Sequence, residues 1–322
     1  MLSRLPRGVL GASWGALLLV GCGASPAPPT AEPLGVQSNR TTAPITLRLA
    51  PRGPMTFATE LGVTLASEML GQPMSADLDT RGVRRVVEVR PDGSMVIEEI
   101  DTASRYQITM MGNTESGPET PDAPGEPHRY VLDARGQQLE TLPPPGAPPA
   151  GAPPPGAPPP GGQQGGAMRD VVQDRLQGAL EPMVRALAFP ERPVSIGDEW
   201  GADGRISFRD VDPSMEGEAL YRLTQRLERF EGTGATRVAI VAFDGSLEGS
   251  GRSAGGQMPT DAGIAGRIQV RGFYAVALVD GFTRTARATV DGEIRLGPEQ
   301  IMRFPLRGEI RWDAAPIPMQ AQ

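Results

Sequence analysis

The side chains that could support acid–base or nucleophilic chemistry are few, and their spacing does not suit it. His128 is the only histidine, so a multi-histidine metal centre is excluded and one imidazole base remains. It follows Pro127 at the start of an extended stretch, where an exposed histidine is the ordinary outcome. Glu98 and Glu99 are consecutive within a predicted strand, so their side chains point to opposite faces and cannot act as a pair.

The nearest approach to paired carboxylates is Asp198-Glu199. A glycosidase would need a second acid across a cleft, and a turn aspartate that binds its own backbone is the simpler interpretation. The chain has no Gly-x-Ser-x-Gly elbow on a strand-to-helix turn, no phosphate-binding loop and no Asp-x-Asp-x-Asp-Gly calcium loop. We therefore expect no catalytic residues, no metal and no cofactor, and we do not expect an enzyme.

The single cysteine, Cys22, closes a segment organised like an export signal. Arg4 and Arg7 precede the apolar stretch 9–20, which is too short to span a membrane comfortably. Leu19-Val20-Gly21-Cys22 resembles the lipobox of bacterial lipoproteins. The resemblance implies removal of residues 1–21 and acylation of Cys22, with palmitate among the usual chains. The alternative is an ordinary secretory signal with an incidental cysteine.

This resemblance also predicts a location. Several acyl chains anchor stably, because each buried methylene contributes about 0.8 kcal/mol. Gly23 follows the cysteine, whereas aspartate there commonly retains lipoproteins at the inner membrane. In a cell with two membranes we therefore expect the outer membrane, with the protein facing the periplasm. Residues 22–43 are rich in Pro, Ala, Ser and Thr and predict a flexible tether.

Charge excludes one class of partner. The net charge is −7, and the 31 basic residues form no dense cluster. Nucleic-acid binding requires a concentrated positive surface, so we expect no nucleic-acid partner.

Residues 44–142 read as a first β-rich half. Met55, Phe57, Leu61, Val63 and Leu65 alternate with polar residues, as in a half-buried antiparallel strand. Pro91-Asp92-Gly93 predicts a hairpin turn between two further apolar runs. The polar stretch 112–127 predicts a loop, and 130–142 predicts a last hairpin.

Residues 143–167 predict a Pro/Gly-rich linker of polyproline II geometry, disordered and without a fold of its own. It serves as a spacer or, alternatively, as a ligand for a proline-binding groove. The segment 168–189 then predicts an amphipathic helix over about 168–187, because apolar residues recur at spacings of three and four. We expect its apolar side to cover a sheet face.

The helix leads into a structural motif that ends at Trp200. Pro190 ends the helix and Pro193 starts an extended segment. Ile196 and Trp200 are predicted apolar anchors, and Gly197-Asp198 is predicted to form a turn between them. We expect Trp200 to be largely buried.

Residues 190–313 form a second β-rich half, followed by a tail, 314–322. The predicted strands cover 219–230, 236–247, 264–279, 282–296 and 302–312. Three Asp-Gly pairs, at 244–245, 280–281 and 291–292, predict hairpin turns.

The fold class is therefore mainly β: ten to twelve strands in one or two curved antiparallel sheets, with one packed helix. Segments 47–53, 69–74 and 189–200 resemble a family of uncharacterised bacterial β-rich lipoproteins with a Phe-Pro-x-x-Pro-Val-x-x-Gly-Asp-x-Trp motif. A looser similarity is to periplasmic lipoprotein carriers, which implies a curved sheet over an apolar cavity.

Two functions remain open. In the first, which we favour, an acylated envelope lipoprotein binds a lipid or another hydrophobic ligand on its curved sheet. In the second, the apolar faces fill a core and the protein is a non-enzymatic scaffold that binds an envelope protein partner. Alternation demands a buried face under either hypothesis.

Overall fold

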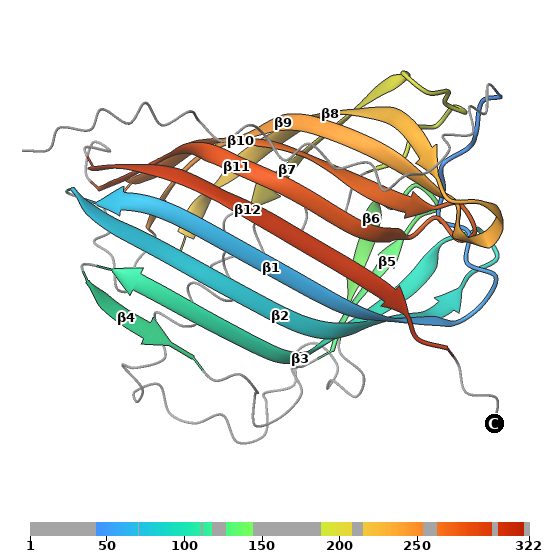
Figure 1. Ribbon diagram of the computed structural model, residues 1–322, viewed down its shortest axis with the longest axis horizontal. Helices are drawn as coiled ribbons and strands as arrows, with labels where there is room; N and C mark the ends of the chain where they lie inside the picture. Colours follow the sequence, from blue (N-terminus) through green and yellow to red (C-terminus); the bar gives the residue numbers. More distant parts are fainter. Residues whose placement is uncertain are drawn as a thin grey trace, which may run out of the picture. The chain divides into compact units, whose positions relative to one another are not determined.

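The computed structural model describes residues 43–69, 71–110, 112–117, 127–143, 188–207, 215–253, 263–297 and 302–318. All of them belong to one compact unit of the chain, 37–322. Twelve antiparallel strands make a single open sheet (Figure 1). The strands are β1 (Met55–Met69), β2 (Gln72–Val89), β3 (Met95–Met110), β4 (Asn113–Ser116), β5 (His128–Leu132), β6 (Gln138–Leu142), β7 (Glu199–Ser207), β8 (Met215–Glu231), β9 (Val238–Ser253), β10 (Gly263–Ala277), β11 (Thr283–Gly297) and β12 (Met302–Pro316).

The sheet order is β6-β5-β3-β2-β1-β12-β11-β10-β9-β8-β7, with β4 also paired to β3. Most neighbours are consecutive in sequence and joined by short connections. There are two exceptions: β3 pairs with β5, and β12 pairs with β1 over eleven residue positions, from Phe57 opposite Pro316 to Ser67 opposite Leu306. The two predicted β-rich halves therefore share one sheet, and its edges are β6 and β7.

Period-two alternation separates an inner from an outer face. On β1, Phe57, Leu61, Val63 and Leu65 are buried, which confirms the predicted strand and its apolar side. We define the inner face as the one that carries these side chains and their cross-strand partners. Trp312 on β12 lies opposite Leu61 and is buried as well, so the core lies on this face.

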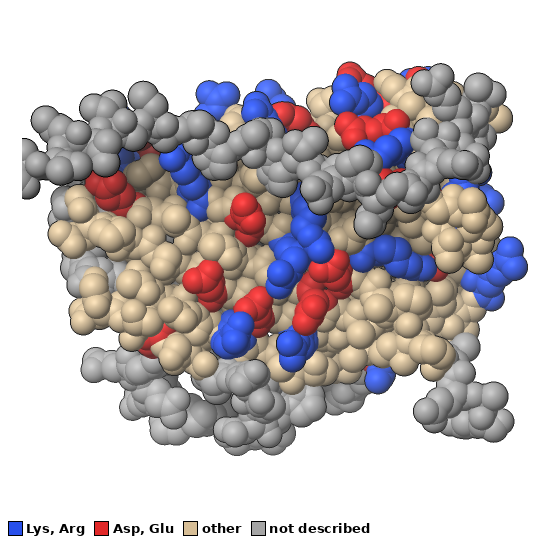
Figure 2. Space-filling view, in the orientation of Figure 1, with Lys and Arg blue, Asp and Glu red and all other residues tan. Residues whose placement is uncertain are grey.

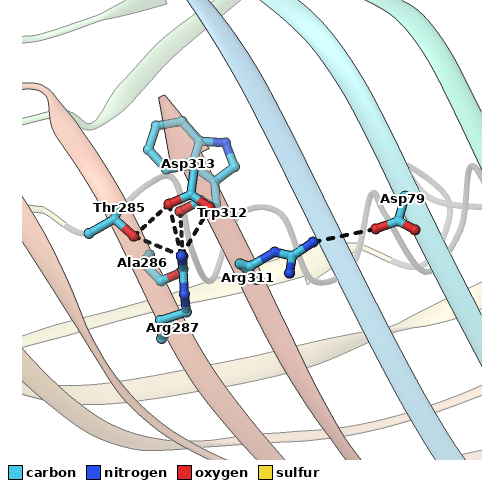
Figure 3. A network of polar contacts seen from close by, with 7 residues as sticks. All are labelled: Asp79, Thr285, Ala286, Arg287, Arg311, Trp312 and Asp313. Carbon is cyan, nitrogen blue, oxygen red and sulfur yellow. Dashed lines mark hydrogen bonds and ion pairs between the residues drawn. The ribbon is translucent and has the colours of Figure 1, made fainter. Parts of the chain in front are cut away.

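The outer face carries cross-strand ion pairs (Figure 2). In Figure 3, Arg287 on β11 contacts both carboxylate oxygens of Asp313 on β12 at 3.0 Å, and Arg311 lies 3.7 Å from Asp79 on β2. Further pairs of this kind join Arg105 to Asp79, Arg81 to Glu60, Arg271 to Asp244, Arg267 to Glu248, Arg252 to Glu216 and Arg307 to Asp291. Exposed pairs of this type contribute at most about 1 kcal/mol each.

The sheet curls at one end, where its two edges approach each other. Arg135, in the β5–β6 turn, donates to the carbonyl oxygen of Phe189 at 3.0 Å and pairs with Glu191 at 2.7 Å. Phe189 and Glu191 precede β7, at the opposite edge of the sheet. Nearby, Ile45 and Val194 exchange two backbone hydrogen bonds of 2.8 Å. We call this the closed end; it lies at the right in Figure 1.

The segment 188–198 follows the predicted motif only in part. Gly197 has a φ of 94°, and Asp198 accepts a hydrogen bond from the backbone of Ser195 at 3.0 Å, so the predicted turn is confirmed. Ile196 as an anchor is wrong, because it is 41% exposed. The turn breaks the strand alternation after the bridge at Val194, and Val194 is the buried residue.

The other predicted anchor, Trp200, is partly buried at the edge of the core. It packs against the core, and its Nε1 donates to the carbonyl oxygen of Ala188 at 3.2 Å. The edge position of β7 explains the remaining exposure, because a strand neighbours it on one side only.

Two of the three predicted Asp-Gly turns are wrong. Asp280-Gly281 does turn between β10 and β11, but Asp244-Gly245 and Asp291-Gly292 lie inside β9 and β11. In both strands the aspartate faces outward and pairs with an arginine on the next strand. The glycine faces inward where a neighbouring backbone passes close by, which only glycine permits.

The predicted helix of about 168–187, most of the 143–167 linker, and Cys22 with its tether lie outside the described residues. In the described part of the chain the only helical turn is the 3₁₀ turn η2 (Gly234–Thr236). No helix there is both long and apolar enough to span a membrane.

The inward glycines predict where the curl tolerates no side chain. A Cβ on Gly292 would lie 2.4 Å from the carbonyl oxygen of Arg267 and 2.8 Å from the Cα of Ile268. We expect Gly292→Ala to destabilise the protein by about 1–3 kcal/mol through overpacking, measured as a lower Tm by circular dichroism. Gly266→Ala is the control, because its nearest atom would be 3.4 Å away. An equal Tm for both variants would contradict the assignment.

Candidate functional site

The inner face is not equally buried along its length. Toward the closed end its apolar side chains are enclosed, with Val270, Val290 and Ile310 at most 2% exposed. Further from the closed end, the inward side chains on β9 to β12 are only half-buried. We call this set the far inner face: Leu247, Ile264, Ile268, Ile294, Phe304 and Leu306.

The strand register places these side chains next to one another. Ile268 lies opposite Leu247 on β9 and Gly292 on β11, and Ile294 lies opposite Phe304 on β12. Glycines recur among them, so positions without a side chain separate the larger apolar side chains. The described inward positions of this part of β8 to β12 carry no charged side chain. Such a surface suits a hydrocarbon chain.

A buried ion pair lies nearer the closed end. Arg84 on β2 and Glu99 on β3 face inward, are 7% and 8% exposed, and form a hydrogen bond from the arginine Nε. The guanidinium carbon lies 5.1 Å from the ring centroid of Trp312. Burial lowers the pKa of Arg84, but Glu99 and Tyr130 outweigh burial, so its pKa is raised. The Arg84 guanidinium therefore remains charged inside the core.

Two buried donors accompany this pair. Thr80 and Trp312 lie on either side of Leu61, across β2 and β12. The Thr80 hydroxyl and the Trp312 Nε1 are fully buried without a hydrogen-bond partner among the described residues. An ordered water is the ordinary acceptor at such a place. The polar cluster therefore belongs to the core. The far inner face is a less buried continuation of the same core.

A second buried polar contact ties the closed end to the sheet. Tyr274 donates to Gln225 at 2.5 Å, and Gln225 donates to the carbonyl oxygen of Ala188 at 3.4 Å. Burial raises the pKa of Tyr274 well above its ordinary value, so its hydroxyl stays protonated and remains a donor. This contact holds the segment before β7 against β8 and β10.

A groove of about 850 Å³ lies at the closed end, between the β10–β11 turn and the start of β1. Its polar residues include Asp280 and Arg284, which pair at 2.5 Å. Arg284 also lies 5.1 Å above the ring of Phe57. The apolar walls include Pro54, Met55, Ala235, Val238, Ala277, Val279 and Pro316.

The residues considered for chemistry are not brought together. His128 is exposed on β5, although it lies opposite Glu99 across the strand pair. Glu98 faces outward between Arg85 and Arg129, at 3.5 and 3.8 Å. The predicted divergence of Glu98 and Glu99 is confirmed. Asp198 accepts a hydrogen bond from the backbone within its own turn, as predicted by the simpler interpretation.

The inward pairing of Arg84 with Glu99 was not predicted, although the sequence contains a signal for it. Arg84-Arg85 and Glu98-Glu99 lie on opposite sides of the Pro91-Asp92-Gly93 turn. The observed register sets Arg84 against Glu99 and Arg85 against Glu98. One pair must therefore face inward and the other outward.

A comparison with protein-family models finds no match for this chain, and no curated protein matches it. The resemblance to uncharacterised bacterial lipoproteins therefore stays a prediction.

The buried pair predicts an asymmetric mutational response. Glu99→Gln leaves the Arg84 guanidinium unpaired in the core, so we expect a loss of about 3–5 kcal/mol in the free energy of unfolding, measured with urea. Glu60→Gln, in the exposed pair with Arg81, is the matched control and should cost less than about 1 kcal/mol. Similar losses for both variants would show that the Arg84–Glu99 pair is not buried as described.

Proposed function

We propose that this chain is a lipid-anchored envelope protein that binds a hydrophobic ligand, an acyl-chain lipid, along the far inner face. One observation carries the proposal: the side chains of the far inner face are apolar and uncharged, yet they stay partly exposed where the core ends. Each square ångström of such surface removed from water contributes about 25 cal/mol. An acyl chain lying along the strands would remove much of it.

The anchor is part of the same proposal. Acylation of Cys22 and an outer-membrane location rest on the lipobox and on Gly23. The predicted amphipathic helix of about 168–187 and the resemblance to a lipoprotein family also remain proposals. None of the proposed roles requires catalysis, a metal or a cofactor.

The scaffold hypothesis has one observation in its favour. The described sheet is open, with β6 and β7 as its edges. An edge strand offers unpaired backbone donors and acceptors to a partner strand. A protein that uses its edges to bind an envelope partner would have no need of the far inner face.

Ligand uptake separates the two functions. We expect residues 37–322, which contain every described strand, to bind a fluorescent fatty acid in titrations. Ile268→Trp fills the far inner face and Ile268→Asp places a charge there, so each should weaken binding at least about tenfold, the equivalent of 1.4 kcal/mol.

The neighbouring variant Gln269→Asp is the control, because Gln269 belongs to the outer face of the same strand. It should change the affinity less than about twofold, and circular dichroism should show that all three variants fold. If the wild-type chain takes up no fatty acid, or if Gln269→Asp weakens binding as much, ligand binding at this face is wrong and the scaffold remains.

A further inference from the structure

Exposed apolar side chains gather at the closed end. Among the described residues, seven large hydrophobic side chains are exposed, and six belong to turns or strand ends there. The six are Val87, Val89, Leu139, Ile196, Val279 and Ile317. Ile196, Val279 and Ile317 lie in the loops and the tail at this rim, at 41%, 45% and 43% exposure. Leu220, the seventh, lies along β8, away from this end.

Three arginines at the same end lack a polar partner among the described residues. Arg48, Arg52 and Arg192 are exposed and have no ion pair or hydrogen bond with any residue that the structure describes. Most carboxylates around them are engaged, although the exposed Glu140 and Glu199 likewise have no ion pair or hydrogen bond with a described residue. Asp92, Asp133, Glu191, Asp198 and Asp280 each accept hydrogen bonds from nearby backbone or side-chain donors. Three cations are thus available to an anionic surface, although the whole chain is acidic.

The closed-end groove is lined both by an arginine without a polar partner among the described residues and by an exposed apolar side chain. Arg52 and Val279 both line it, and its walls are mostly apolar. A free cation beside exposed apolar groups is the arrangement by which proteins contact the interface of an anionic bilayer, with the apolar groups in the headgroup region and the cations near phosphates.

The chain also enters the sheet at this end. The first described residues, from position 43, lead to the bridge between Ile45 and Val194. Cys22 lies about twenty residues upstream, a distance of at most about 70 Å when fully extended. A tether of this length would let the closed end reach the membrane that holds an anchor at Cys22.

We propose that the closed end binds the surface of an anionic phospholipid bilayer, with Arg48, Arg52 and Arg192 near the phosphates and Val279 and Ile317 among the headgroups. This goes beyond ligand binding at the far inner face and uses a different surface. Peripheral contact of this kind would hold the sheet against the membrane and orient it.

Vesicle sedimentation with residues 37–322 tests the proposal without the anchor. The chain should bind vesicles of phosphatidylglycerol and phosphatidylcholine, and bind much less to phosphatidylcholine alone. Each basic side chain near an anionic surface is worth roughly fivefold in binding. The double variant Arg48→Glu/Arg52→Glu should therefore lose at least about twenty-fivefold in affinity. Arg222→Glu/Arg303→Glu, with the same change in charge on exposed strand positions, should lose less than about threefold.

The contribution of the exposed apolar side chains to vesicle binding is tested separately. Val279→Ser/Ile317→Ser should weaken vesicle binding severalfold, whereas Leu220→Ser should leave it unchanged. Absence of binding to anionic vesicles would overturn the proposal and leave the closed end to a protein partner. Equal losses in the test and control variants would also overturn it. Fatty-acid uptake by the same variants should be unchanged, so failure here is distinguishable from failure of the inner-face ligand site.

Discussion

The structure depends on one constraint: every long strand has an apolar side, and all of these sides must leave water together. Twelve strands in one sheet present a wide apolar face, and the described sheet meets the constraint by curling at the closed end. Contacts of Arg135 with Phe189 and Glu191 fasten the two edges there. Away from that fastening the same face becomes half-buried, which is the physical origin of the candidate ligand surface.

The curl explains residue choices that otherwise look arbitrary. Inward glycines such as Gly272 and Gly292 occupy places where a neighbouring backbone would meet a Cβ at 2.0 and 2.4 Å. On the outer face the spacing allows long side chains, and arginines there pair with carboxylates on the next strand. On the inner face Arg84 pairs with Glu99, and its guanidinium stacks against Trp312.

Local pattern predicted most strands and the Pro91-Asp92-Gly93 hairpin, because alternation and turn residues act over a few positions. It could not predict the pairing of β12 with β1, because these are the last and the first described strand along the chain and local pattern carries no information over that separation. It misread Asp244-Gly245 and Asp291-Gly292, because an Asp-Gly pair fits a bend inside a curved strand as well as a turn. The far inner face was hidden for a related reason: alternation shows which side chains share a face, but the degree of burial depends on the curl.

Native mass spectrometry of the full chain, purified from its own envelope in mild detergent, tests the central claim most directly. The account predicts one bound acyl-chain lipid in near-stoichiometric amount, released on unfolding, and a covalent acyl modification that remains on the peptide containing Cys22. A mass equal to that of the unliganded polypeptide, with a free thiol at Cys22, would contradict both the ligand and the anchor.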